Sequence, residues 1–372
     1  MIGQSTYDKI DILEEMMKNK NPEIITGVKS GKYKTKFLPA LGLLLFAPFT
    51  AEYMIGYLDV TGSFDVMFLY LIFFGPLYGG AALIIREVTR RAGLGWPTMI
   101  MLAFAFSLFQ AGLVDHGLFN PSFQDIDYWQ DLRDPTYIPL FGISAYQAVE
   151  FISGHVIWSI AVPIVFMEIF FSNQKKEPWL SNFNFVIIFI LYLLASAFIF
   201  QDQVTMDQFL PSLTQFIFTG IIVIVLIFAA FVVGRRHRPS SRKVAPNPWL
   251  VGVITLLILS MHTIIELLGA LFGFPADFMM AWPGVILRFT LLLLLGYLVL
   301  HWSKRKFWGA MHHLALAGGA ILTRTWVAFL IEPLGDVSFN SKLIGNTIFL
   351  AGAFVLIFLG AYLIRKKDVQ RT

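Results

Sequence analysis

Nine ionisable residues interrupt otherwise apolar stretches of this sequence. They are Glu52, Asp115, His116, Glu150, His155, His262, Glu266, Arg288 and Arg324. A charge in a hydrocarbon environment is costly, so such residues usually face a protein interior or water and commonly take part in function. Carboxylates, histidines and arginines together could bind a charged substrate or carry protons through an apolar region. We therefore take these nine as the candidate substrate or proton site.

His262 and Glu266 are four residues apart. On a continuous helix this spacing places both side chains on one face, where they could brace two helices, relay a proton or hold a metal ion. The HExxH arrangement of zinc proteases is absent, which makes a metal the weakest of the three alternatives. The chain has no cysteine, and we expect no cofactor.

The candidate site carries an unbalanced charge. Four of the nine residues are carboxylates and two are arginines, which leaves a charge of −2 if the histidines are neutral. Protonated histidines, protonated carboxyls or a bound cation could each close that gap, because an uncompensated charge is unfavourable in low dielectric. Arg324 needs an acidic partner, and we expect Glu52, Glu150 or Glu266.

The composition indicates which elements must position these residues. Hydrophobic residues make up 57% of the chain and charged residues 14%, whereas an ordinary soluble domain is about a quarter charged. Apolar runs repeatedly reach the roughly 20 residues that a helix needs to cross a bilayer. The sequence therefore predicts an all-α polytopic membrane helix bundle, not a soluble enzyme or a nucleic-acid-binding protein. Ten transmembrane helices are expected, at residues 37–57, 66–86, 97–119, 143–172, 180–200, 212–234, 249–272, 283–302, 309–331 and 343–364.

The distribution of lysine and arginine predicts the orientation. With the N-terminus inside, every basic residue falls in a cytoplasmic segment except Arg133, Arg288, Arg324 and Lys342, as the positive-inside rule requires. We expect both termini in the cytoplasm, the protein in the cell membrane, and tryptophans at helix ends, such as Trp179, at the headgroup level. The chain then divides into a cytoplasmic segment at 1–36 with an amphipathic helix at 7–20, a transmembrane domain at 37–365 and a tail at 366–372.

Depth separates the ionisable residues into two groups. The nine candidates lie in the outer half of the predicted helices or near their middle. Five others, Arg86, Glu87, Glu168, His312 and His313, lie close to the cytoplasmic boundary, where long side chains can reach water. We therefore expect a polar cavity open to the outside and a sealed inner half. The aromatic segment from Asp115 to Gly142 would be either a lid over that cavity or an ordered loop over the helix ends.

These features favour a secondary transporter or permease, with proton coupling through the histidines. One alternative is a membrane-embedded hydrolase or transferase, metal-dependent or not, that acts at the outer leaflet. Another is a non-catalytic partner or immunity-type subunit. The expected partners are the lipid bilayer and a small-molecule or ion substrate, with no nucleic acid. Phosphate-binding and dinucleotide-binding glycine motifs are absent from the sequence, as is the GxSxG motif of hydrolases.

Overall fold

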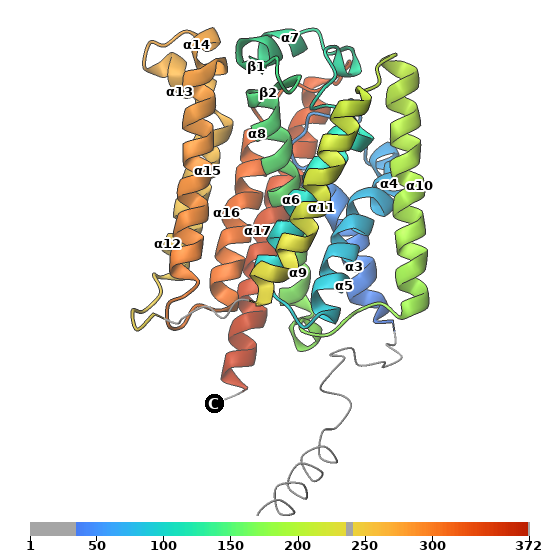
Figure 1. The fold of residues 1–372 in the computed structure, drawn as a ribbon. Helices are drawn as coiled ribbons and strands as arrows, with labels where there is room; N and C mark the ends of the chain where they lie inside the picture. Colours follow the sequence, from blue (N-terminus) through green and yellow to red (C-terminus); the bar gives the residue numbers. More distant parts are fainter. Residues whose placement is uncertain (1–34, 236–240, 371–372) are drawn as a thin grey trace, which may run out of the picture.

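The computed structural model describes residues 35–235 and 241–370, and within them the chain is an all-α bundle (Figure 1). The predicted amphipathic helix at 7–20 lies outside the described residues. The strands among the described residues are β1 (Tyr137–Ile138) and β2 (Ile143–Ser144), which form a short antiparallel hairpin in a loop.

Each of the ten predicted spans corresponds to a helical segment. In chain order these are α3 (Phe37–Pro48) with η1 (Phe49–Tyr53); α4 (Phe64–Phe74), η2 (Gly75–Gly79) and α5 (Gly80–Arg91); α6 (Trp96–Phe109) with η3 (Gln110–Val114); α8 (Ala145–Gly154), η6 (His155–Ala161) and α9 (Val162–Phe170); α10 (Asn182–Met206); α11 (Leu213–Arg235); α12 (Pro248–Thr263) and α13 (Ile265–Leu271); α15 (Trp282–Trp302); α16 (Ala310–Val327); and α17 (Phe339–Val369). The helix α17 continues into the predicted C-terminal tail.

Length and hydropathy together single out fewer than ten of these as membrane spans. Among the described residues, seven helices are long and apolar enough to cross a bilayer, and α12 with α13 makes an eighth if the bent pair counts as one. The remaining two differ in kind. The segment Phe37–Tyr53 is apolar but shorter, and α16 carries His312, His313 and Arg324.

The position of α16 explains its polarity. It packs against α12, α17 and α9, so neighbouring helices rather than lipid cover much of its surface. Gly319 allows the closest approach, because a Cβ there would lie 2.6 Å from the Gly252 carbonyl oxygen of α12. A helix surrounded by protein can hold polar side chains that a lipid-facing helix could not.

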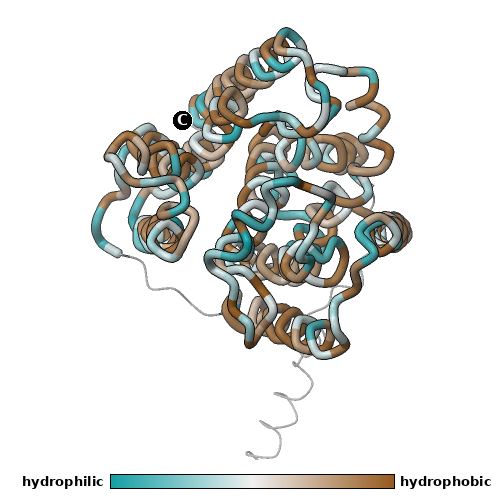
Figure 2. Tube along the Cα trace, turned by 90° about the horizontal axis from the view of Figure 1, so that it is seen from above, coloured by the Kyte–Doolittle hydropathy of each residue, from teal (hydrophilic) through white to brown (hydrophobic). Residues whose placement is uncertain are grey.

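The two ends of the bundle differ in charge. We call the end where α5 and α11 finish and α12 begins the basic end, and the opposite end the acidic end. The acidic end is crossed by η4 (Phe123–Asp125), α7 (Trp129–Arg133), η5 (Asp134–Thr136), the β hairpin and α14 (Ala276–Met280). Figure 2 shows the hydrophilic residues gathered in the loops that cross this end.

The segment between α6 and α8 crosses the acidic end and is held there by its own contacts. The Trp129 indole nitrogen donates to the Asn120 carbonyl oxygen at 2.9 Å, and the Phe123 and Trp129 ring centroids are 4.8 Å apart. Its α7 and η5 contact α14. This segment thus ties the acidic ends of several helices together.

Candidate functional site

Four of the membrane helices change from α-helical to π-helical hydrogen bonding partway along. The π segments are η1, η2, η3 and η6. Such segments are rare and occur frequently at functional sites. Each of the four contributes a side chain to the polar centre of the bundle. These side chains are Glu52, Tyr78, Gln110 and His155.

One group of polar side chains surrounds Glu52, and we call it the Arg324 cluster. Its members are Glu52, Tyr57, Tyr78, Asp115, His155 and Arg324. The Tyr57 hydroxyl donates to a carboxylate oxygen of Glu52, and Tyr78 interacts with the same carboxylate. Glu52 is buried, so these two phenols supply the polar contacts that water would give an exposed carboxylate.

Arg324 lies beside this carboxylate, but its hydrogen bond goes to the backbone. Its Nη2 donates to the Ala51 carbonyl oxygen at 2.9 Å, and its guanidinium carbon lies 4.7 Å from the centre of the Trp158 ring. Arg324 interacts electrostatically with both Glu52 and Glu150, and the interaction with Glu52 is the stronger one. Two of its three expected acidic partners are thus nearby, but the contact with each is electrostatic only.

Asp115 and His155 complete the Arg324 cluster. Asp115 accepts a hydrogen bond from the Gly117 amide at 3.0 Å and interacts with Gln110 and Glu52. The His155 Nδ1 lies 2.7 Å from the Phe151 carbonyl oxygen. Because a carbonyl only accepts hydrogen bonds, Nδ1 carries a proton, and Nε2 of the neutral ring is an acceptor.

A break in the seventh helical segment shapes the second polar group. The expectation that His262 and Glu266 share one face of a continuous helix was wrong, because α12 and α13 meet at an angle of 80° around Ile264. The break leaves the His262 carbonyl oxygen available, and Arg288 Nη1 donates to it at 2.6 Å. The arginine therefore replaces a lost helical hydrogen bond.

This second group, the Arg288 cluster, consists of Tyr146, Glu150, His262, Glu266 and Arg288. Arg288 Nη1 donates to Glu150 at 2.8 Å, and its Nη2 donates to Glu266. The His262 Nε2 lies 3.4 Å from the same Glu150 oxygen, and the Tyr146 hydroxyl donates to Glu266 at 3.4 Å. One buried guanidinium thus joins α8, α12, α13 and α15.

The two clusters adjoin but differ in exposure. Glu150 is bonded to Arg288 and also interacts electrostatically with Arg324, so it links the two clusters. The side chains of Glu150 and Glu266 are 35% and 27% exposed, whereas Glu52 is buried. Each cluster holds two carboxylates, one arginine and one histidine. With neutral histidines each therefore has a charge of −1.

His116 does not join its neighbour Asp115 in the Arg324 cluster. Its ring is buried among three phenylalanines, with centroid distances of 5.0 Å to Phe200, 6.4 Å to Phe209 and 6.0 Å to Phe216. The backbone causes this separation: His116 has a φ of 61°, just after η3 ends. The structure thus brings together eight of the nine candidate residues and leaves His116 apart.

His262 and Glu266 do not face each other as a metal-binding pair would. Glu266 faces Arg288, and the His262 ring approaches Glu150 instead. Within residues 35–235 and 241–370 there is no group of three or more metal-ligating side chains that could hold an ion.

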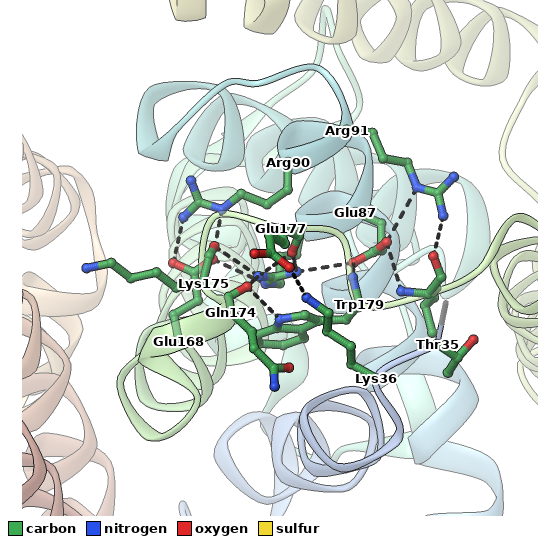
Figure 3. A network of polar contacts seen from close by, with 12 residues as sticks. Thr35, Lys36, Glu87, Arg90, Arg91, Glu168, Gln174, Lys175, Glu177 and Trp179 are labelled. Carbon is green, nitrogen blue, oxygen red and sulfur yellow. Dashed lines mark hydrogen bonds and ion pairs between the residues drawn. The ribbon is translucent and has the colours of Figure 1, made fainter. Parts of the chain in front are cut away.

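A further polar network lies at the basic end, where side chains were expected to reach water. That expectation was wrong for Arg86 and Glu87, which are both 0% exposed. Their partners belong to the loop between α9 and α10, which includes η7 (Ser172–Gln174). Glu87 accepts hydrogen bonds from the amides of Trp179 and Leu180 at 2.6 Å and 3.1 Å (Figure 3).

Arg86 and Arg90 hold the same loop and the end of α9. The Arg86 guanidinium stacks on Trp179 at 3.2 Å from the ring centre and donates to three loop carbonyls, including Lys175 at 3.0 Å. Arg90 binds Glu168 through two hydrogen bonds, of 2.9 Å and 2.6 Å. Trp179, expected at the headgroup level, is instead fully buried beneath Arg86. We call these residues the loop clamp.

The rim of the loop clamp is an exposed ion pair between Lys36 and Glu177. The hydrogen bond and charge of Lys36 hold the pKa of the Glu177 carboxyl below its usual range. This pair ties the start of α3 to the loop, but its exposure to solvent screens the interaction.

Some members of these clusters were not predicted from the sequence. Tyr57, Tyr78 and Tyr146 are uncharged, so hydropathy and charge patterns give no reason to select them. The π segments carry no simple composition signal, although η2 begins with the sequence Gly75-Pro76. Tyr78 could have been noticed as a hydroxyl beside that pair.

Comparisons with known proteins bear on the fold rather than the chemistry. Neither the curated proteins nor the solved structures compared with this chain give a match. A model of a family described as an uncharacterized membrane protein family matches residues 41–366. This range contains every member of the Arg324 and Arg288 clusters. With its apolar helical bundle and a match over most of its length, the chain belongs to this uncharacterized membrane protein family.

Proposed function

We propose that this protein is a proton-coupled secondary transporter whose substrate and proton site is formed by the Arg288 and Arg324 clusters. The observation that carries the proposal is the position of Glu150. It is partly exposed, bonded to Arg288, and close enough to Arg324 to interact with it. A carboxylate that is bonded to one arginine and interacts electrostatically with a second can change partners when it gains or loses a proton.

The charges of the clusters favour a proton or a cation as the coupling ion. Each cluster has one more carboxylate than arginine, and the surrounding helices are apolar. A net negative charge in such a place is costly unless a proton or cation neutralises it. The partly exposed Glu150 and Glu266 would take up a proton or cation first, from the acidic end, and the buried Glu52 would follow.

The broken helix supports the same proposal. Transporters often bind substrates and ions where a membrane helix is interrupted and leaves backbone groups unpaired. Here the break between α12 and α13 leaves the His262 carbonyl oxygen to Arg288. Protonation of Glu266 would weaken its bond to Arg288 and so loosen the contact that holds α13 against α15.

Reconstitution into liposomes tests the proposal. The full-length protein would be supplied with a panel of ions and small organic solutes under an imposed pH gradient, with a pH-sensitive dye inside. We expect uptake of at least one solute, accompanied by proton movement. Glu150→Gln and Glu266→Gln should uncouple or abolish that uptake, because an amide cannot take up a proton at these positions.

The matched control is Glu332→Gln, which makes the same charge change at an exposed position. It should transport as the wild type does. Uptake that ignores the pH gradient, or that is unchanged in both cluster variants, would contradict the proposal. If no solute moves but a peptide or lipid-linked substrate is cleaved, and Glu150→Gln abolishes that cleavage, the enzyme alternative replaces it.

A further inference from the structure

An apolar groove runs along the surface between α12, α16 and α17. Trp249, Gly252 and Val253 line it on α12, Ala315 and Gly318 on α16, and Ile357 on α17. Its walls are almost entirely apolar, its volume is about 120 Å³, and it is partly open to the surroundings. Two of these residues are glycines and one is alanine. The glycines are points of close contact between the helices, since a Cβ at Gly252 would lie 3.2 Å from the Ala315 carbonyl oxygen and one at Gly318 would lie 3.3 Å from Ile357.

The groove begins at the basic end, beside two loops that are fastened together. The Ser241 amide donates to the Lys304 carbonyl oxygen at 2.8 Å, and the Lys306 amide donates to the Lys243 carbonyl oxygen at 2.9 Å. The Ala245 amide also donates to Lys306, at 2.9 Å. The segment before α12 and the segment after α15 therefore form one surface.

This surface is basic. It carries Arg242, Lys243, Lys304 and Lys306, and within the described part of the chain none of these four forms an ion pair with an acid. Apolar side chains stand among them, since Val244 and Phe307 are exposed. Cations mixed with exposed apolar groups are typical of the headgroup level of a membrane.

We propose that the groove and this basic surface bind one anionic phospholipid from the leaflet at the basic end. An acyl chain would lie in the groove, along the roughly 12 Å of α12 from Pro248 to Leu256. The phosphate would lie against the four cations. A second copy of this chain fits less well, because it would bring its own cations to the same surface.

Native mass spectrometry of the full-length protein in detergent tests this inference. Phosphatidylglycerol and phosphatidylcholine with the same acyl chains would be added in separate titrations. We expect the first phosphatidylglycerol to bind more than about 30-fold tighter, because each cation near an anionic headgroup contributes about a fivefold change. The double variant Arg242→Gln/Lys306→Gln should lower that preference by about 30-fold.

The groove is tested separately from the charges. Val253→Trp places a large side chain over the groove and should weaken phosphatidylglycerol binding, whereas Val225→Trp, on the exposed surface of α11, should not. Lys176→Gln/Lys366→Gln, which removes two exposed cations elsewhere at the basic end, should keep the lipid preference. Circular dichroism would confirm that each variant is folded.

Three results would overturn the inference. Equal affinity of the wild type for the two lipids would show that the anionic headgroup is not recognised. An unchanged lipid preference in folded Arg242→Gln/Lys306→Gln would exclude the basic surface as the headgroup site. Full phosphatidylglycerol binding by folded Val253→Trp would remove the groove as the acyl-chain site.

Discussion

Replacement of Glu87 by alanine should release the loop between α9 and α10. Glu87 is fully buried and accepts hydrogen bonds from the Trp179 and Leu180 amides. It also offsets the charge of Arg86, 3.1 Å away. The substitution leaves two buried amides without acceptors, at about 1–3 kcal/mol each. Breaking a buried ion pair costs about 3–5 kcal/mol in comparable cases, so we expect the loop to open about 3–5 kcal/mol more easily.

Limited proteolysis measures this opening directly. Lys175 and Lys176 lie in the loop and offer trypsin a site that must leave the clamp before it is cleaved. When reclosing is faster than cleavage, the rate follows the population of the open loop. A difference of about 3–5 kcal/mol then corresponds to cleavage about 150-fold to 5,000-fold faster. Fragments would be identified by mass spectrometry of the protein in detergent.

A matched control lies in the same loop. Glu177→Gln removes one acid as well, but from an exposed position, and should change the rate by no more than about twofold. Glu87→Gln should fall between the two, because its amide oxygen can still accept one hydrogen bond. If Glu87→Ala is folded and its loop is cleaved less than about threefold faster than in the wild type, the loop clamp does not hold the loop as argued.

Three other predictions concern the remaining contacts. Arg288→Met leaves Glu150, Glu266 and the His262 carbonyl without their common hydrogen-bond donor. The substitution should lower the free energy of unfolding by about 3–5 kcal/mol, measured by denaturation in detergent. A loss below about 1 kcal/mol would refute the role of Arg288. Gly79→Ala would place a Cβ against the Leu44 carbonyl oxygen of α3 and should destabilise the folded protein by about 1–3 kcal/mol. The control is Gly220→Ala in α11, where a Cβ would contact no neighbouring atom, and it should not destabilise the protein. Equal melting temperatures of the two variants would exclude the close approach of η2 to α3. The Lys36–Glu177 pair lowers the Glu177 pKa, so its stabilisation is present at neutral pH and is lost as the pH falls through that lowered pKa. The difference in melting temperature between wild type and Glu177→Gln should therefore shrink steadily as the pH is lowered below neutral, and a difference that grows on acidification would contradict the assignment.

Hydropathy predicted most of the helices because lipid imposes a simple rule on them. A helix that faces hydrocarbon must be apolar over about 20 residues, and α10 and α11 follow this rule closely. The prediction was less complete where helices meet protein instead. The pair α12 and α13 reads as one apolar run, yet it bends at Ile264 with neither proline nor glycine in the turn. Arg288, from another helix, stabilises that bend.

The candidate site could be predicted in its members but not in its arrangement. Because a charge inside a membrane is costly, the sequence indicated Glu52, Glu150, Arg288 and Arg324 as candidates, and all four lie in the two adjoining clusters. Their pairing depends on where π segments turn the side chains, which residue type alone does not indicate. The loop clamp was missed for a related reason. Depth alone suggested that Arg86 could reach water, whereas a loop about ninety residues later in the chain covers it.

The enclosed position of α16 has a consequence for how the protein is made. Charged residues in a hydrophobic segment oppose its release from the translocon into lipid by itself, and α16 carries Arg324 in addition to two histidines. In the finished bundle α12, α9 and α17 surround it. We therefore expect α16 to enter the bilayer together with a neighbour rather than by itself. A ribosome-bound chain that ends before α17 should leave this segment accessible to modifying reagents, and synthesis of α17 should bury it.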